Sequence, residues 1–318
     1  MNKRNQLLAM FTVGVLAGPM VAQAQYDYHP VAYPGMPNTQ VFGINNRGDA
    51  VGNGYDGLDT FPFIYDSKKD TYTDVATLEG YESTVLLGIN DSGVIVGSVI
   101  REDDSGRNGF IRDKKGNFTV FSHPDAASTT NPRSINNKGL VTGFRDTERG
   151  AFVGFIFDPK SDSFSDINPT AFFTIAQGIN SKGEVVGSSN FDAANDPCPA
   201  TGNPFRRYGW LRAKDGSVTF FTVNGSHTSA RDIGDNGSVV GFVIDPEDGK
   251  FKGFKTELDG SQCQSITLPT SDLLEFPGSD SNFLQGTTNA GVITGGYDDV
   301  DSINSYIATP QKKSGKKK

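Results

Sequence analysis

The stretch Gly88–Gly97, with the sequence GINDSGVIVG, decides the fold because the chain repeats it six times. The position held by Asn90 recurs at residues 45, 90, 136, 180, 234 and 288, so that successive copies lie 45, 46, 44, 54 and 54 residues apart. The first residues of the motif are degenerate in the last two copies. A fixed period of this length is typical of repeat architectures.

Each copy has the pattern of a β-hairpin. An apolar residue precedes Asn and Gly, which bracket two polar residues, and a β-branched run follows. Asn and Gly tolerate the positive φ of tight turns between strands. A second pair of strands follows each copy, as in Gly109–Phe121, where an aromatic residue, a polar turn and an alternating run succeed one another. Four short strands in about 45 residues are typical of a propeller blade.

The two ends of the chain together predict a closed ring. The sixth copy supplies only three strands, and the segment Val31–Gly35 aligns with Val120–Asp125, the fourth strand before the third copy. We therefore predict an all-β fold over residues 25–310, a six-bladed β-propeller with ring closure by the N-terminal strand, which leaves no open sheet edge. A linear β-solenoid is the alternative, but it would not need this complementarity between the ends.

The repeated core, followed by Gly-Phe-Ile, resembles the bacterial extracellular HAF-repeat family. The fullest match is Phe118–Phe157, and all six copies take part, so the resemblance spans nearly the whole chain after the first 24 residues. The resemblance implies an exported, propeller-like repeat protein. It implies no activity and carries no active-site residue onto this sequence.

The N-terminus reads as a signal peptide over residues 1–24. Lys3 and Arg4 precede the apolar stretch Leu7–Val21, and a small-x-small pattern ends at Ala24. We predict cleavage near Ala24 and a secreted or periplasmic protein. An uncleaved anchor is the competing interpretation, but two glycines and a proline interrupt the apolar stretch, which is short for a membrane span. No later segment is long and apolar enough to cross a membrane, so we expect no transmembrane span in the mature chain.

Charge excludes one class of partner. Loss of Lys3 and Arg4 leaves 27 basic residues against 37 acidic ones, a net charge of −10, so we expect no nucleic acid partner. We also expect a monomer. Residues 311–318 carry five lysines and no apolar side chain, which predicts a basic disordered tail, with an electrostatic tether to anionic cell-surface polymer as the alternative.

The two cysteines are permitted to pair in an oxidising compartment. Cys198 lies in the long insertion Asn190–Arg207 of the fourth repeat, which should project from the face that carries the second-to-third strand loops. Cys263 begins the outer strand of the fifth repeat and should lie near the other face. This placement argues against a disulfide, because bridging needs Cα atoms within about 7 Å.

The loop between the second and third strands of each repeat is acidic, which predicts one negative face of the ring. The turns between the third and fourth strands, on the opposite face, are rich in lysine. Solubility alone would account for both, whereas an acidic face could also recruit cations or a basic partner. The candidate binding residues on the acidic face are Asp103, Asp104, Asp146, Asp248, Asp299 and Asp301.

Calcium is the natural ion for clustered carboxylates, and Glu102–Asp104 or Asp298 with Asp301 could contribute ligands. No complete calcium-loop pattern is present, so no cofactor is predicted with certainty. The metal site remains unknown. Trp210 occupies the repeated aromatic slot and is expected to pack between blades.

Two functions remain open at this point. The first is a secreted, non-catalytic binding or scaffold protein that presents a propeller face to an extracellular polymer, glycan, surface or protein partner. The alternative is an extracellular polysaccharide hydrolase or lyase that uses carboxylates in the central funnel. His123 and His227 could act as general bases, but no nucleophile elbow, phosphate loop or zinc motif accompanies them. The acidic residues recur in outer loops, which favours a protein that is not an enzyme.

Overall fold

The computed structural model describes most of the repeat region. The described residues are 26–103, 105–167, 172–199, 207–245, 248–268, 273, 274, 276, 277, 279, 281–299 and 302–311. The predicted signal peptide and the basic tail beyond Gln311 lie outside these residues. Within them, none of the helices reaches the length and apolar character that a membrane crossing requires.

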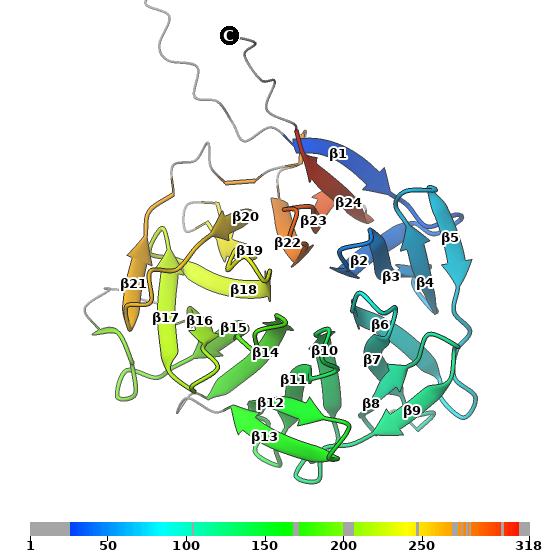
Figure 1. Cartoon of the computed structure of the whole chain (residues 1–318), viewed down its shortest axis with the longest axis horizontal. Coiled ribbons are helices and arrows are strands. Elements are labelled where there is room, and N and C mark those ends of the chain that lie inside the picture. The colour runs from blue at the N-terminus through cyan, green and yellow to red at the C-terminus, as the bar shows by residue number, and fades with distance from the viewer. Residues whose placement is uncertain are drawn as a thin grey trace, which may run out of the picture.

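The chain folds as an all-β β-propeller, with the sheets arranged around a central axis (Figure 1). The first two repeats contain β2 (Asn38–Ile44), β3 (Asp49–Tyr55), β4 (Thr60–Asp66), β5 (Thr71–Asp74), β6 (Ser83–Ile89), β7 (Ile95–Ile100), β8 (Arg107–Arg112) and β9 (Phe118–Phe121). The next two contain β10 (Thr130–Ile135), β11 (Val141–Asp146), β12 (Phe152–Asp158), β13 (Ser163–Ile167), β14 (Phe173–Ile179), β15 (Val185–Asn190), β16 (Arg207–Arg212) and β17 (Val218–Val223). The remaining strands are β1 (Tyr26–Val31), β18 (His227–Ile233), β19 (Val239–Ile244), β20 (Phe251–Thr256), β21 (Cys263–Ile266), β22 (Ser281–Thr287), β23 (Ile293–Asp299) and β24 (Ser302–Pro310).

The repeated motif forms the predicted hairpin turn. In the first copy, the side-chain oxygen of Asn45 accepts hydrogen bonds from the backbone N–H groups of Arg47 and Asp49, at 2.9 and 3.0 Å. Gly48 has a φ of 91°, in the region that favours glycine. The last Gly of the motif has another role, because a Cβ at Gly97 would collide with the ring of Phe110 and the carbonyl oxygen of Val85.

The repeated aromatic slot forms the core between sheets, as predicted. Its members are completely buried, and they are Phe63, Phe110, Phe155, Trp210 and Phe254. Trp210 packs in one cluster with Phe220 and Tyr208, so it is a core residue and not an exposed platform.

The prediction of six four-stranded blades is wrong. Four repeats form a complete blade from four consecutive antiparallel strands, namely β2–β5, β6–β9, β10–β13 and β14–β17. The fifth repeat forms only the three-stranded sheet β18–β19–β20. Its predicted fourth strand, β21, instead pairs in parallel with β17 of the preceding repeat, from Phe220 opposite Cys263 to Val223 opposite Ile266.

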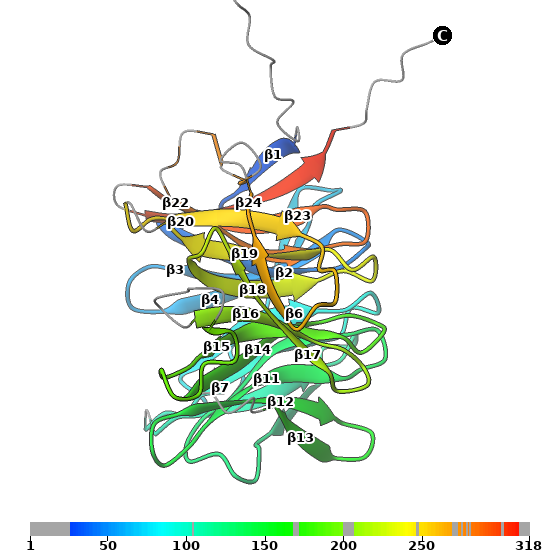
Figure 2. The same cartoon turned by 90° about the vertical axis from the view of Figure 1, so that its left-hand side faces the viewer.

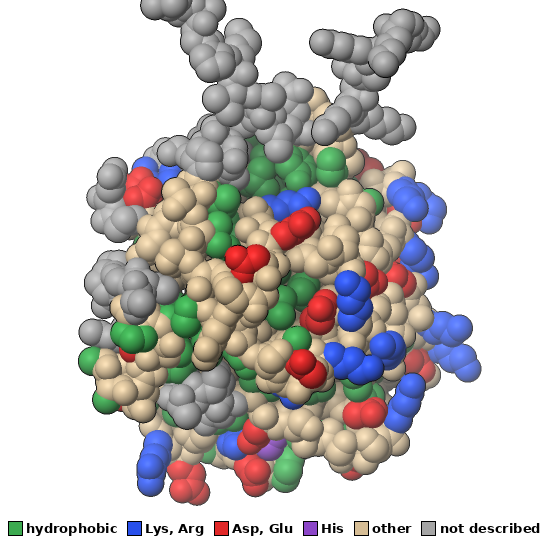
Figure 3. Space-filling model, turned by 60° about the vertical axis from the view of Figure 1, so that its left-hand side comes forward, with side chains coloured by type: hydrophobic (Ala, Val, Ile, Leu, Met, Phe, Trp, Pro, Cys, Tyr) green, Lys and Arg blue, Asp and Glu red, His purple; other side chains and the backbone are tan. Residues whose placement is uncertain are grey.

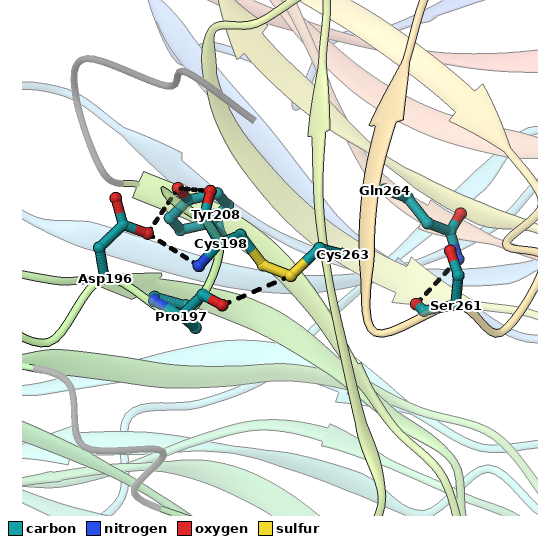
Figure 4. Close-up of a disulfide and its surroundings, with 7 residues drawn as sticks. All are labelled: Asp196, Pro197, Cys198, Tyr208, Ser261, Cys263 and Gln264. Atoms are coloured by element: carbon teal, nitrogen blue, oxygen red, sulfur yellow. Dashed lines mark hydrogen bonds between the residues drawn. A yellow bond between two sulfur atoms is a disulfide. The ribbon is translucent and has the colours of Figure 1, made fainter. Parts of the chain in front are cut away.

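A disulfide between Cys198 and Cys263 accompanies this change of partner, with Cα atoms 5.8 Å apart (Figure 4). The sequence argument against the bond failed because it assigned the strand that begins at Cys263 to the outer edge of the fifth repeat, whereas that strand, β21, pairs with β17 of the fourth repeat. Asp196 orders the insertion at this point: its carboxylate accepts hydrogen bonds from the backbone N–H of Cys198 and the hydroxyl of Tyr208, at 2.9 and 2.8 Å.

The predicted closing segment Val31–Gly35 is also corrected, because only Val31 of it belongs to a strand. The residues that pair with β24 are those of β1, from Tyr26 opposite Pro310 to Val31 opposite Ser305 (Figure 2). The sequence alignment had matched the turn that follows such a strand. In that turn the N–H of Tyr33 donates to the hydroxyl of Thr39, as the N–H of His123 does to that of Thr130.

Candidate anion-binding site in the central channel

Each innermost strand carries a β-bulge, and the bulged residue faces the central channel. The registers of β2, β6, β10, β14, β18 and β22 all shift by one residue at the same place in the motif. Bulges re-aim side chains in this way. All six bulged residues line one cavity of the channel, which we call the upper cavity. They are Phe42, Leu87, Arg133, Gln177, Arg231 and Gln285, and four of them are polar.

Two of these bulged residues are arginines, and neither forms an ion pair with a carboxylate of the described residues. The Nε atoms of Arg133 and Arg231 are buried and have no hydrogen-bond acceptor among the described residues. The guanidinium of Arg133 lies 5.8 Å from the ring centre of Phe144, and that of Arg231 lies 4.9 Å from the ring centre of Phe242. Stacking on a ring face stabilises a cation only in part.

The surroundings disfavour the charge on both arginines. Burial, and to a lesser extent the charge of Arg107, lowers the pKa of Arg133 to about 10. Burial, with the charges of Arg133 and Arg207, lowers the pKa of Arg231 to about 9. An anion in the channel would oppose both effects, because an opposite charge nearby favours the charged form.

Two further arginines are near enough for their charges to lower the pKa values of Arg133 and Arg231. Arg107 begins β8 and Arg207 begins β16, and the side-chain oxygen of Asn190 accepts a hydrogen bond of 2.6 Å from Nε of Arg207. Burial raises the pKa of Tyr55, at the end of β3, to about 12, although the charges of Arg107 and Arg133 oppose the shift. We call Arg107, Arg133, Arg207 and Arg231 the arginine cluster.

The opposite mouth of the channel is a ring of short polar side chains from the motif turns. These are Asn46, Asp91, Asn137, Ser181, Asp235 and Asn289. The backbone N–H of Asn46 donates to Asp91, and that of Asp91 donates to Asn137, at 2.8 and 2.9 Å. The same contacts continue around the ring, so the two carboxylates are engaged in holding neighbouring repeats together.

The channel is narrow. Its two cavities have volumes of about 50 and 70 Å³, which corresponds to a few water molecules in each. A carboxylate or a sulfate group has the right size for such a space, whereas a sugar ring is too large. Asp232 is the one carboxylate that lines the upper cavity among the described residues, and its Oδ2 accepts the backbone N–H of Thr287 at 2.8 Å.

The predicted acidic residues are spread over separate loops and bond within them. Asp146 accepts hydrogen bonds from the backbone N–H groups of Ser128 and Thr129, at 2.9 and 2.8 Å. Asp103 and Asp248 each cap their own loop through a backbone N–H two residues further on. Asp104, Asp301 and the side chain of Asp299 lie outside the described residues.

No three His, Cys, Asp or Glu side chains in the described ranges gather into a group that could hold a metal ion. In the side view of Figure 3, acidic and basic side chains are interspersed. His123 is buried and does not line either cavity of the channel, and its Nε2 atom lies 3.1 Å from Oδ1 of Asp166. Burial lowers its pKa.

Sequence reasoning missed the arginine cluster, although one signal was present. The residue immediately before each motif is the bulged one, and that column of the repeat reads Phe, Leu, Arg, Gln, Arg and Gln. Polar residues in a column that belongs to the innermost strand are not needed to pack the repeats, so they indicate another role. The bulge that turns them inward is a property of strand pairing, so it could not be read from the column alone.

Comparisons with known proteins support the fold. A family model described as "Protein of unknown function (DUF3466)" matches residues 36–171. The match does not distinguish the HAF-repeat family, which stays a prediction. No curated protein matches the chain in sequence.

Solved structures similar in fold include a TolB protein and a sugar dehydrogenase. TolB from Acinetobacter baumannii superposes with a TM-score of 0.51 at 10% identity, covering 70% of this chain and 52% of TolB, so the chain spans about half of that protein. The PQQ-bound aldose sugar dehydrogenase from Streptomyces coelicolor gives a TM-score of 0.50 at 13% identity, covering 90% of this chain and 98% of the dehydrogenase. Similarity at such identities shows a β-propeller and nothing about activity.

Proposed function

We propose that this chain is an exported, non-catalytic binding protein that holds an anionic group of an extracellular ligand in the arginine end of its channel. The observation that carries the proposal is that Arg133 and Arg231 line one cavity of the channel, each with a buried Nε that has no acceptor in the described part of the chain; Arg112 shares such an Nε but does not line the cavity. Their bulges turn both side chains toward one cavity.

The energetic cost of this arrangement supports a function in binding. Both side chains are half-buried, and a charge that is partly removed from water without a partner destabilises a fold; two like charges in one cavity add repulsion. At the same bulge, the fourth and sixth repeats carry Gln177 and Gln285, so the fold accepts an uncharged residue there. Arginine at this position is therefore not required by the scaffold.

A polysaccharide-cleaving funnel has less support. Hydrolysis of glycosidic bonds generally uses two carboxylates on either side of the scissile bond. Asp232 is the one carboxylate among the described residues that lines the upper cavity. The two carboxylates at the other mouth, Asp91 and Asp235, accept hydrogen bonds from neighbouring repeats. The narrow cavity also excludes a sugar ring.

The disulfide supports export, because such bonds form and persist in oxidising compartments. The sequence of residues 1–24 supports the same proposal through its signal-peptide pattern.

The test is calorimetric titration of the chain from residue 25 with sodium sulfate and with sodium acetate. The double variant Arg133→Gln with Arg231→Gln should bind either anion at least tenfold more weakly. The matched control is Arg112→Gln with Arg212→Gln, which removes the same charge from the opposite ends of β8 and β16 and should bind as the wild type does. Equal weakening by both double variants, or no anion binding by the wild type, would show that the site is not an anion site.

A further inference from the structure

A row of phenylalanines leads outward from Arg133. Its guanidinium lies over Phe144, whose ring is 4.7 Å from that of Phe152. The row continues through Phe173, 5.2 Å from Phe152, to Phe172, 4.6 Å from Phe173. Phe152 and Phe173 begin their strands at the arginine end of the channel, so the row lies on that face.

A second row repeats the arrangement two repeats further along. The guanidinium of Arg231 lies over Phe242, whose ring is 5.0 Å from that of Phe251. Phe283 extends this row, 6.2 Å from Phe251. An arginine at the bulge thus occurs together with a phenylalanine on the second strand and another at the start of the third, in both repeats.

The rows are partly open to solvent. Phe152, Phe173, Phe251 and Phe283 are half-buried, and the side chain of Phe172 is 60% exposed. Apolar rings gathered beside a charged site generally mark a binding surface. The core of each sheet is filled by other aromatic residues, so these rings are additional to the scaffold.

The combined chemistry selects one kind of ligand. We infer that the anion held in the channel is the C-terminal carboxylate of an extended polypeptide whose last residues are apolar and lie along a phenylalanine row. This inference rests on the proposed function. Capture of a terminal carboxylate with adjacent apolar pockets is an established mode of peptide recognition.

Three observations favour this ligand. A carboxylate on a slender chain can enter the cavity of about 50 Å³, but a sugar ring cannot. The accessible rings of Phe152, Phe173 and Phe172 follow one another at 5.2 and 4.6 Å, which matches about three residues of extended chain and is more than a small acid covers. The chain from residue 25 has 27 basic and 37 acidic residues, a net charge of −10, which repels a polyanion but tolerates a single carboxylate.

The test uses a hexapeptide ending in Leu-Val-Phe, prepared with a free carboxylate and with an amide, and 3-phenylpropionate as the small acid. Fluorescence polarisation of the labelled peptides should show binding of the free acid and at least tenfold weaker binding of the amide. Phe172→Ala should weaken binding of the free acid at least threefold. Leu58→Ala is the matched control, because Leu58 is 96% exposed on a different repeat, and it should have no effect.

The outcomes separate this inference from the function on which it rests. Sulfate binding with equal affinity for the two peptides would overturn the inference and leave the anion site standing. Equal affinity for phenylpropionate and the peptide would assign the site to a small acid. Tighter binding of tetragalacturonate, unaffected by Phe172→Ala, would assign it to an acidic glycan. No binding of sulfate, acetate or peptide would overturn both proposals.

Discussion

The backbone N–H of Asn289 donates a hydrogen bond to Oδ1 of Asn46 at 2.8 Å, although the two residues are 243 positions apart in the chain. The turn of the sixth motif therefore contacts the turn of the first. The Asn46 amide also donates to Asp91, so one side chain links three repeats.

Substitution of Asn46 should therefore weaken the whole fold. Asn46→Ala removes the acceptor for Asn289 and a donor to Asp91, and we expect a loss of about 1–3 kcal/mol in the free energy of unfolding, measured with urea. Asn195→Ala is the control, because that amide bonds only within its own loop to Asp192. Equal losses in the two variants would contradict a linking function for Asn46.

Removal of a channel arginine should stabilise the ligand-free protein. Arg231→Gln places at this bulge the residue that the fourth and sixth repeats already have. We expect the free energy of unfolding to rise by about 1 kcal/mol, because a half-buried charge that has no carboxylate partner in the described part of the chain is lost. Arg212→Gln, at the far end of β16, should change it little. Destabilisation by Arg231→Gln would mean that Arg231 has a structural partner.

The stability of the protein should fall between pH 4 and pH 8 through Asp232. Burial raises the pKa of Asp232 to about 7 from 3.8, with a smaller contribution from Asp235, while the N–H groups of Thr287 and Ile233 oppose the shift. Since the folded-state pKa is the higher one, this stabilisation is complete below pH 4 and is lost as the pH rises through 7.

Asp232→Asn should remove that pH dependence and keep an acceptor for Thr287. We expect the free energies of unfolding of the variant and the wild type to be similar at pH 5. At pH 8 the variant should be the more stable protein. Urea denaturation at both values measures this. Glu148→Gln, at an exposed loop position, is the control and should alter neither value. A wild-type excess in stability at pH 8 would refute the prediction.

Loss of the disulfide should release β21 from β17. Cys198→Ser with Cys263→Ser removes a link across 65 residues, and we expect about 4 kcal/mol of destabilisation. Hydrogen exchange should quicken in β21 and along β17 but not in β9, which pairs with β8 of its own repeat. Unchanged exchange in β21 would show that strand pairing alone holds it.

Local chemistry made the hairpins, the aromatic slot and the all-β propeller readable from the sequence. The turn between β2 and β3 needs a side-chain acceptor at Asn45 and a positive φ at Gly48, and few residues other than Asn and Gly supply both. The slot of Phe110 needs the bare backbone of Gly97 beside it. Such requirements recur with the motif, so a single sequence exposes them.

Only the tertiary structure decided which strand β21 joins, where the N-terminal strand begins and which side chains meet in the channel. Pairing of β21 with β17 uses the free edge of the fourth blade and is accompanied by the bond to Cys198, both distant in sequence. The arginine cluster draws its members from four repeats, and a bulge orients two of them. Such arrangements depend on long-range contacts between strands, and no local pattern encodes them.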